Sequence, residues 1–184
     1  MNIDLVRPEQ KHKAAALALR QEFFDHGEKV INGSEMLDTV ASYEEWLANV
    51  QANSQSDTVS PEWVVTDTFF ALDENGRIVG IIDLRHELKG FLKDFGHCGY
   101  SVRPSERKKG YATGMLSLIL QVAGNLGLPS IQLSVERSNL ASVKTILRNG
   151  GVLERSFEYQ GEMADVYLIK MQKAPEIFVP VCDE

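Results

Sequence analysis

The feature that most constrains the fold of this chain is a pair of short apolar runs separated by residues that favour a tight turn. Residues 68–72 and 78–84 are rich in β-branched and aromatic side chains, and the five residues between them include Asn75-Gly76. An Asn-Gly pair favours a hairpin turn because both residues tolerate positive φ. The pattern predicts an antiparallel hairpin, around which the rest of the fold must be arranged.

Helix and strand signals alternate on both sides of this hairpin. In chain order we expect a strand (3–6), helices (8–27 and 42–51), the hairpin, a strand (95–102), a helix (111–126), a strand (131–135), a helix (139–148) and a second hairpin (152–159 with 164–171). In the strand at 95–102, Gly96 and Gly99 indicate a bulge or a close backbone approach. Mixed strands with interleaved helices predict an α/β (α+β) layered protein.

Composition sets limits on the partners of this protein. The chain has 184 residues, 43% of them hydrophobic, which fits one domain with a sizeable core. The 26 acidic and 19 basic residues give a net charge of −7. This sign argues against nucleic acid or an anionic membrane as partners, and it favours a cationic or neutral one.

Other sequence features bear on location and domain limits. Two cysteines are too few for a disulfide framework. The sequence also shows neither a secretory signal nor an apolar run long enough to span a membrane. We therefore expect a cytoplasmic protein. We expect a single domain over residues 1–173 and a tail over 174–184. The tail contains the apolar segment 177–181, which covers either a partner or the sheet edge of its own chain, so a homodimer is one of two open arrangements.

The link between the expected strand at 95–102 and the next helix is basic. Residues 103–110 hold Arg103, Arg107, Lys108 and Lys109, four of the 19 basic residues in an acidic chain. Small residues at positions 110 and 112 let an anion approach the free N–H groups of the helix. The link taken alone is also consistent with a solvated basic turn. The order of strand, link, small residues and helix favours a phosphate or pyrophosphate site.

This segment resembles a known family. Arg107-x-x-Gly110-x-Ala112 resembles the Arg/Gln-x-x-Gly-x-Gly/Ala signature with which GNAT-superfamily N-acyltransferases bind the pyrophosphate of coenzyme A. Residues 102–104, 139–142 and 149–151 match the family in order and spacing, and the resemblance runs from Ile3 to Met171. Within the family, the chain looks like a bacterial branch described as predicted acetyltransferases.

The resemblance implies a fold, an activity and a cofactor. The fold is a mixed, mostly antiparallel central sheet with helices on both faces. The activity is that of an enzyme which transfers an acetyl group from acetyl-CoA to a primary amine by direct attack in a ternary complex, without a metal. The implied cofactor-binding residues are Tyr100, Ser101 and Val102 along the pantetheine, Arg107, Lys108, Lys109, Gly110, Tyr111, Ala112 and Thr113 around the pyrophosphate, and Asn139 and Ser142 on the thiol side.

The catalytic groups follow partly from this resemblance and partly from residue chemistry. The backbone N–H of Val102 is the implied donor to the oxyanion. His97, His86 and Glu87 are candidates for the base, because histidine titrates near neutrality and burial raises the pKa of a glutamate. For each of the three, a purely structural role is the alternative.

One position departs from the family pattern. The usual acid for the leaving thiolate is a tyrosine four residues after Ser142, but that position holds Ile146. Tyr100, Tyr111 or water are the replacements that we consider. The departure also motivates a second hypothesis, a module that senses acyl-CoA without turnover. We expect the acceptor to be a small amine or an exposed amino group, and the variable segments 23–60 and 85–94 to form its pocket.

Overall fold

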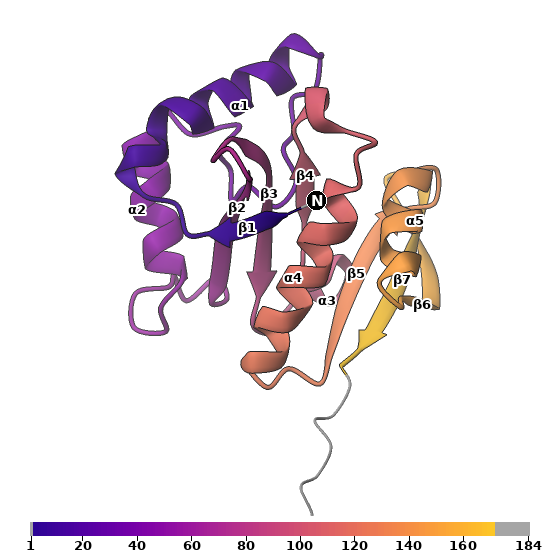
Figure 1. The fold of residues 1–184 in the computed structure, drawn as a ribbon. Helices are drawn as coiled ribbons and strands as arrows, with labels where there is room; N and C mark the ends of the chain where they lie inside the picture. Colours follow the sequence, from indigo (N-terminus) through magenta and orange to yellow (C-terminus); the bar gives the residue numbers. More distant parts are fainter. Residues whose placement is uncertain (1, 172–184) are drawn as a thin grey trace, which may run out of the picture.

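The computed structural model describes residues 2–171, which form two antiparallel sheets. The first sheet has the order β1 (Ile3–Val6), β2 (Thr66–Asp73), β3 (Ile78–Arg85) and β4 (Tyr100–Val102); the second has the order β5 (Ser130–Glu136), β7 (Glu162–Lys170) and β6 (Val152–Tyr159). The helices are α1 (Lys13–Asp25), α2 (Tyr43–Asn53), α3 (Leu92–Phe95), α4 (Tyr111–Asn125) and α5 (Leu140–Arg148), with short 3₁₀ turns η1 (Gln10–His12) and η2 (Pro104–Glu106). Figure 1 shows α4 in front of the first sheet and α5 beside the second.

The central hairpin is confirmed. Strands β2 and β3 pair antiparallel from Thr66↔Arg85 to Leu72↔Ile78. In the turn, the Asp73 carboxylate accepts hydrogen bonds from the backbone N–H groups of Asn75 and Arg77, each at 2.9 Å. A side chain that replaces backbone partners in this way stabilises a tight turn.

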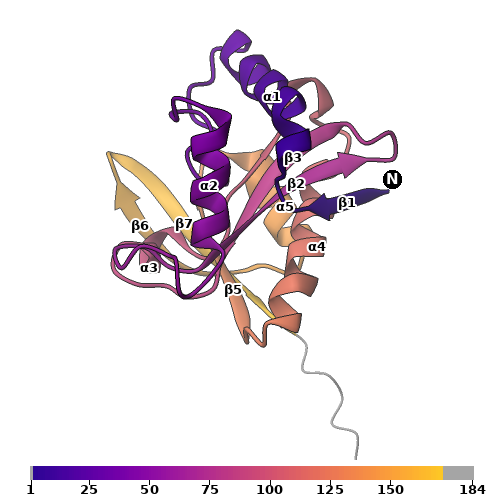
Figure 2. The ribbon, with the colours of Figure 1, turned by 90° about the vertical axis from the view of Figure 1, so that its left-hand side faces the viewer.

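Helices cover both faces of the first sheet, as Figure 2 shows. On one face, Phe70 and Ile81 of the sheet pack with Trp46 of α2 and Phe23 of α1. On the other face, α4 packs through Met115, Leu116 and Ile119 against Ala71 and Ile82. Successive residues of a strand point to opposite faces, and nearly all residues of β2 and β3 are buried, so both faces of these strands lie in the core. The expected α/β architecture with helices on both faces is therefore confirmed.

The two sheets meet at one point just before β4. Gly96 forms an isolated bridge with Leu133 of β5. The N–H of His97 donates to the carbonyl of Gln132 at 2.8 Å, and the N–H of Gln132 donates to His97 Nδ1 at 3.0 Å. A Cβ at Gly96 would lie 2.4 Å from the Gln132 carbonyl oxygen, which confirms the predicted close approach. Beyond this junction β4 and β5 belong to separate sheets and do not pair.

The strand expected over residues 95–102 is shorter in the structure. Residues 92–95 form the helix α3, and regular strand geometry begins only at Tyr100. The reason is Gly96, whose φ of +86° lies in the left-handed region, so it ends α3 and turns the chain toward β5. Gly99 packs against Gly33, where a Cβ would lie 2.1 Å from the Gly99 carbonyl oxygen. The connection between α1 and α2 therefore lies directly against the start of β4.

Two sequence expectations concern the ends of the chain and membranes. The tail at 174–184, including its apolar segment, lies outside the described residues, so the predicted domain limit at residue 173 stays a prediction. Within residues 2–171, no helix is both long and apolar enough to cross a membrane.

Candidate active site

A cleft of about 640 Å³ lies beside β4, on the side where the two sheets separate. Its walls come from β4, the link before α4, the start of α4, helix α5 and the connection between α1 and α2. The predicted cofactor-binding residues in these walls are Tyr100, Ser101, Val102, Arg107, Lys108, Gly110, Tyr111, Ala112, Thr113, Asn139 and Ser142. Residues far apart in sequence thus come together in one cleft.

The outer edge of β4 faces this cleft. Backbone hydrogen bonds join Gly99 and Arg103 to β3, through Asp83 N–H to Gly99 O and Arg103 N–H to Val79 O. Because alternate residues of an antiparallel strand point their backbone groups to opposite sides, the N–H groups of Tyr100 and Val102 point away from β3. An extended amide chain can therefore pair with this edge.

The start of α4 supplies unpaired donors. Gly110 caps the helix in the left-handed region with φ of +88°, and the N–H groups of residues 111–113 donate no backbone hydrogen bond within the described chain. Such groups, at the positive end of the helix dipole, attract anions. The donor set fits a pyrophosphate of coenzyme A at this end of the cleft.

Three basic side chains of the link, those of Arg103, Arg107 and Lys109, have acidic partners. Arg107 forms two hydrogen bonds to the Glu28 carboxylate at 2.6 and 2.8 Å, and its guanidinium lies 5.5 Å from the centre of the Phe23 ring. The hydrogen bonds from Arg107 lower the pKa of Glu28. Lys109 binds Glu106 at 2.8 Å and, unlike the other predicted cofactor residues, does not line the cleft.

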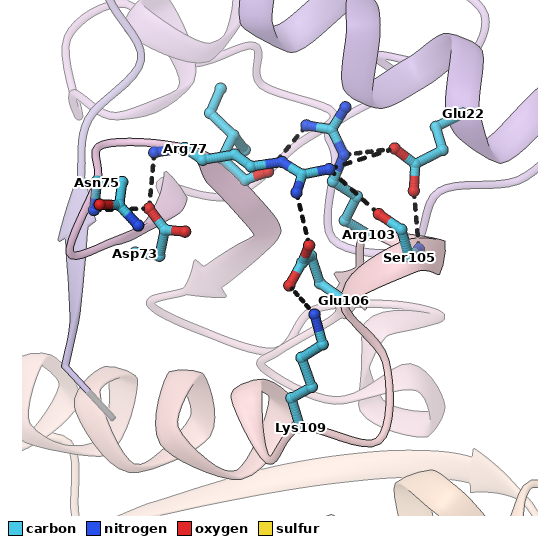
Figure 3. Close-up of polar contacts among 9 residues, drawn as sticks. Glu22, Asp73, Asn75, Arg77, Arg103, Ser105, Glu106 and Lys109 are labelled. Carbon is cyan, nitrogen blue, oxygen red and sulfur yellow. Dashed lines mark hydrogen bonds and ion pairs between the residues drawn. The ribbon is translucent and has the colours of Figure 1, made fainter.

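An ion-pair network holds the link in place, as Figure 3 shows. Glu22 of α1 accepts from the Arg103 side chain and, at 2.8 Å, from the backbone N–H of Ser105. Arg77, at the end of the turn between β2 and β3, binds Glu106 at 2.7 Å. Partial burial raises the pKa of Glu22, but the hydrogen bonds from Ser105 and Arg103 outweigh it and lower that pKa to about 2. The cleft wall is thereby tied to α1 and to the central hairpin.

Helix α5 supplies the opposite wall. Its first turn is capped by Asn139, whose side chain accepts the N–H of Ser142 at 3.1 Å. The Tyr100 hydroxyl lies near Ser142 and Thr145, and burial raises its pKa to about 12. Ile146, at the position of the usual family tyrosine, is 1% exposed and belongs to the core between α4 and α5.

The candidate bases lie outside the cleft wall. His97 joins the two sheets through Gln132, and burial lowers the pKa of its imidazole. His86 Nε2 lies 3.0 Å from the Asp67 carboxylate on β2, and exposed Glu87 pairs with Lys89 at 2.6 Å. Each of these three side chains has a different partner, and their catalytic role stays a prediction.

A second polar cluster lies where the α1–α2 connection meets β4. Fully buried Asp83 accepts from Arg85 at 2.7 Å and from the N–H of Gly99 at 2.5 Å. Glu35 accepts from Asn53 and Trp63, each at 3.1 Å. Burial raises the pKa of Glu35, and the neighbouring charge of Asp83 adds to this effect. Asp83 and Arg85, two residues apart on β3, thus form an ion pair on one face of the strand.

Sequence reasoning missed several residues of the cleft wall. Glu28, Val30 and Asn32 line it at alternate positions, and no sequence signal distinguished them from the rest of that connection. Lys144 and Arg148 line it from α5, and their spacing of four residues places them on one helix face, which is a signal that was available. Within residues 2–171, no three or more His, Cys, Asp or Glu side chains are grouped so that they could hold a metal ion.

Comparisons with solved structures show the same architecture. RimL, a ribosomal L7/L12 alpha-N-protein acetyltransferase in complex with coenzyme A, superposes with a TM-score of 0.69 at 17% identity over 93% of this chain and 95% of its own. The microcin C7 self-immunity acetyltransferase MccE, in complex with acetyl-CoA and AMP, gives 0.67 at 17% identity over 91% and 92%. A spermidine N-acetyltransferase SpeG chimera from Vibrio cholerae and hSSAT gives 0.63 at 17% identity over 93% and 96%.

Sequence comparison identifies the family. No curated protein sequence matches the chain. The family model described as "Acetyltransferase (GNAT) domain" matches residues 4–152, which include β4, the basic link, α4 and α5. The chain therefore belongs to the GNAT acetyltransferase family.

Proposed function

We propose that this protein transfers an acetyl group from acetyl-CoA to the primary amine of an acceptor by direct attack in a ternary complex. The observation that carries the proposal is the cleft between β4 and α5, which combines an unpaired strand edge with free N–H groups at the start of α4. The RimL and MccE structures, with coenzyme A or acetyl-CoA bound, support the choice of ligand.

Different residues of the cleft bind the cofactor and assist the reaction. The N–H groups at the start of α4, together with Lys108, hold the pyrophosphate, and Arg107, which is paired with Glu28, lies beside it. The edge of β4 pairs with the pantetheine amides. The N–H of Val102 points into the cleft and donates to the oxyanion that develops on the acetyl carbonyl. Holding acetyl donor and amine together lowers the barrier by proximity.

The acceptor approaches from the side of the α1–α2 connection. This connection touches the start of β4 through Gly33. The net charge of −7 favours a cationic acceptor. RimL and SpeG are named for a protein amine and for spermidine, and both acceptor types belong in the substrate panel.

We retain His97, His86 and Glu87 as the proposed bases, to be tested one at a time. Loss of a base removes the corresponding limb of the pH-rate profile, whereas loss of a structural contact lowers activity at every pH. His97→Asn, His86→Asn and Glu87→Gln separate these roles, since each substitution keeps a polar side chain of similar size.

The alternative function is an acyl-CoA sensor without turnover. Ile146 at the usual position of the acid, and candidate bases outside the cleft wall, favour this alternative.

Release of coenzyme A from acetyl-CoA, measured with a panel of amines that includes spermidine and a peptide with a free N-terminus, decides between the two functions. An acetyltransferase releases coenzyme A only when a suitable amine is present, and direct attack leaves the intact mass of the protein unchanged after incubation with acetyl-CoA alone. Binding without amine-dependent release supports the sensor.

A further inference from the structure

The carboxylate of Glu35, on the connection between α1 and α2, has one paired and one unpaired oxygen. Its Oε2 accepts from the side-chain nitrogens of Asn53 and Trp63, each at 3.1 Å. Its Oε1 makes no hydrogen bond with residues 2–171, and it is not one of the unpaired side-chain atoms that solvent cannot reach. A ligand that arrives from solvent can therefore contact Oε1.

The charge of Glu35 has no balancing cation among its hydrogen-bond partners. Both donors, the amide of Asn53 and the indole of Trp63, are neutral. The charge of Arg85 acts on Glu35, but the Arg85 guanidinium pairs with Asp83 at 2.7 Å. A partly buried carboxylate that has only neutral partners is costly, and burial accordingly raises the pKa of Glu35. A cation bound at Oε1 would remove this cost.

The backbone holds Glu35 in an unusual conformation. The φ angles of Glu35 and Met36 are +48° and +69°, so two successive residues other than glycine lie in the left-handed region. Such strain is costly and gathers at binding and catalytic sites. The chain is anchored on both sides, because the Ser34 carbonyl accepts from the Trp46 indole at 2.7 Å and Leu37 is fully buried. The surrounding fold thus fixes the position of the carboxylate.

Aromatic side chains from three segments extend away from Glu35. The ring centre of its partner Trp63 lies 6.0 Å from that of Phe91, and Figure 2 shows the segment after α2 close to α3. The ring centres of Phe91 and Phe95 are 5.9 Å apart, and those of Phe95 and Tyr159 are 5.0 Å apart. Phe91 and Tyr159 are 59% and 42% exposed. Exposed aromatic faces beside an unbalanced negative charge suit a cation with an apolar body.

This arrangement borders the start of β4 on the side of α1 and α2. Asp83, whose charge acts on Glu35, lies two residues after Ile81 and so shares the sheet face that packs against these helices. Asp83 accepts the N–H of Gly99, and Gly99 also contacts Gly33, two residues before Glu35. Helix α4 covers the opposite face of the sheet. A ligand at Glu35 and a cofactor held by α4 therefore approach β4 from opposite faces.

We infer that Glu35 binds the ammonium group of an acceptor whose apolar body lies over Trp63 and Phe91. This inference rests on the proposed function and names a substrate class within it, a small monoamine with an apolar, preferably aromatic, body. A row of uncharged rings beside one carboxylate matches a ligand with one charge at one end, whereas a polyamine would place further charges against the rings. Glu35 recognises the ammonium form, and the nitrogen loses its proton to solvent before it attacks the acetyl carbon.

The test is calorimetric titration of phenethylamine into the full-length protein saturated with coenzyme A, which carries no acetyl group and so allows no reaction. The uncharged counterpart 2-phenylethanol is titrated in parallel. In Glu35→Gln, the affinity for phenethylamine should fall by about tenfold or more, while that for 2-phenylethanol changes less than about twofold. In Phe91→Ala, both ligands should lose affinity by about threefold or more.

Two controls keep the test specific. Glu62→Gln removes an exposed carboxylate next to Trp63 in the sequence and should leave both affinities unchanged. Thermal unfolding of ligand-free Glu35→Gln should occur at or above the wild-type temperature, because the amide keeps an oxygen for Asn53 and Trp63 and removes an unbalanced charge.

The outcomes separate this inference from the proposed function. Equal affinity of wild type and Glu35→Gln for phenethylamine, with both proteins binding coenzyme A, overturns the role of Glu35 and leaves the proposed function intact. Tighter binding of spermidine than of phenethylamine overturns the substrate class. A wild-type protein that does not bind coenzyme A overturns the proposed function and this inference with it. A marked loss of stability in ligand-free Glu35→Gln contradicts the premise of an unbalanced charge.

Discussion

Ile146 shows how a single side chain can be fixed by its surroundings. It is buried between α4 and α5, and its Cγ2 lies only 2.3 Å from the place where a Cβ on Gly151 would be. Such packing leaves no volume for a larger group. The helix face that carries a tyrosine in the family pattern therefore serves the core in this chain.

Ile146→Tyr should consequently destabilise the protein and fail to accelerate the reaction. Forcing a phenol ring into this site costs about 1–3 kcal/mol in the free energy of unfolding, because neighbouring side chains must leave their preferred rotamers. Urea denaturation measures this change, and Ile146→Val, which removes one methyl group, is the matched control. Wild-type stability combined with faster release of coenzyme A would refute this prediction.

The sequence predicts turns, helix caps and special glycines better than it predicts contacts between distant side chains. The Asn75-Gly76 turn, the Asn139 cap and the glycines at 96 and 99 were predictable, because each reflects local backbone geometry that few residues satisfy. The contacts of His97 with Gln132 and of Arg107 with Glu28 were not, since they join segments 35 and 79 residues apart. Only the folded chain brings such pairs together.

At the level of elements, Glu22 of α1 connects the basic link before α4 to the rest of the protein. Its carboxylate accepts from Arg103 and from the N–H of Ser105, so it fixes both a side chain and the backbone of the link. Glu22→Gln should lower the free energy of unfolding by about 1–2 kcal/mol at neutral pH and weaken coenzyme A binding several-fold. Calorimetry and urea denaturation measure the two effects.

The same contact has a predictable pH dependence. The pKa of Glu22 is lowered to about 2 in the folded protein, so its stabilisation is complete above the unfolded value near 4.3 and is lost as pH falls toward 2. Wild type should lose stability more steeply than Glu22→Gln between about pH 5 and pH 3. Parallel curves would show that Glu22 is not the group responsible.

The junction between residues 96–97 and β5 should also respond to pH, through His97. Burial lowers the pKa of this imidazole in the folded protein, so the unfolded chain binds the proton first as pH falls below about 6.5. Stability is therefore highest above that pH and declines as pH falls toward the folded pKa. His97→Asn should make this decline shallower. His12, whose pKa is also lowered, contributes to the decline that remains.

Strand and helix positions were largely predictable from apolar periodicity and turn residues, but the strand at 95–102 was not. Its apolar pattern is interrupted by Gly96, and the local sequence does not reveal that this residue joins the second sheet instead of extending the first. The decisive interaction lies with Leu133 and Gln132 on β5, a long-range contact that local propensity cannot encode.

At the level of the whole molecule, acidic charge should influence which acceptors arrive fastest. The net charge of −7 attracts cations over distances that salt shortens. For a polyamine acceptor, kcat/KM should fall several-fold between about 20 mM and about 300 mM salt, whereas a weakly charged amine should change little. Equal salt dependence for both acceptors would exclude electrostatic attraction as a source of selectivity.

Calorimetric titration of acetyl-CoA tests most directly whether the start of α4 binds the pyrophosphate of coenzyme A. Ala112→Asp places a carboxylate among the free N–H groups of α4. A carboxylate at this position stabilises the helix itself, so the variant should fold. Ser117→Asp adds the same charge on the exposed face of α4 and serves as the control. We predict that Ala112→Asp weakens binding by about 100-fold or more and that Ser117→Asp leaves it unchanged; equal affinity in all three proteins would contradict the account.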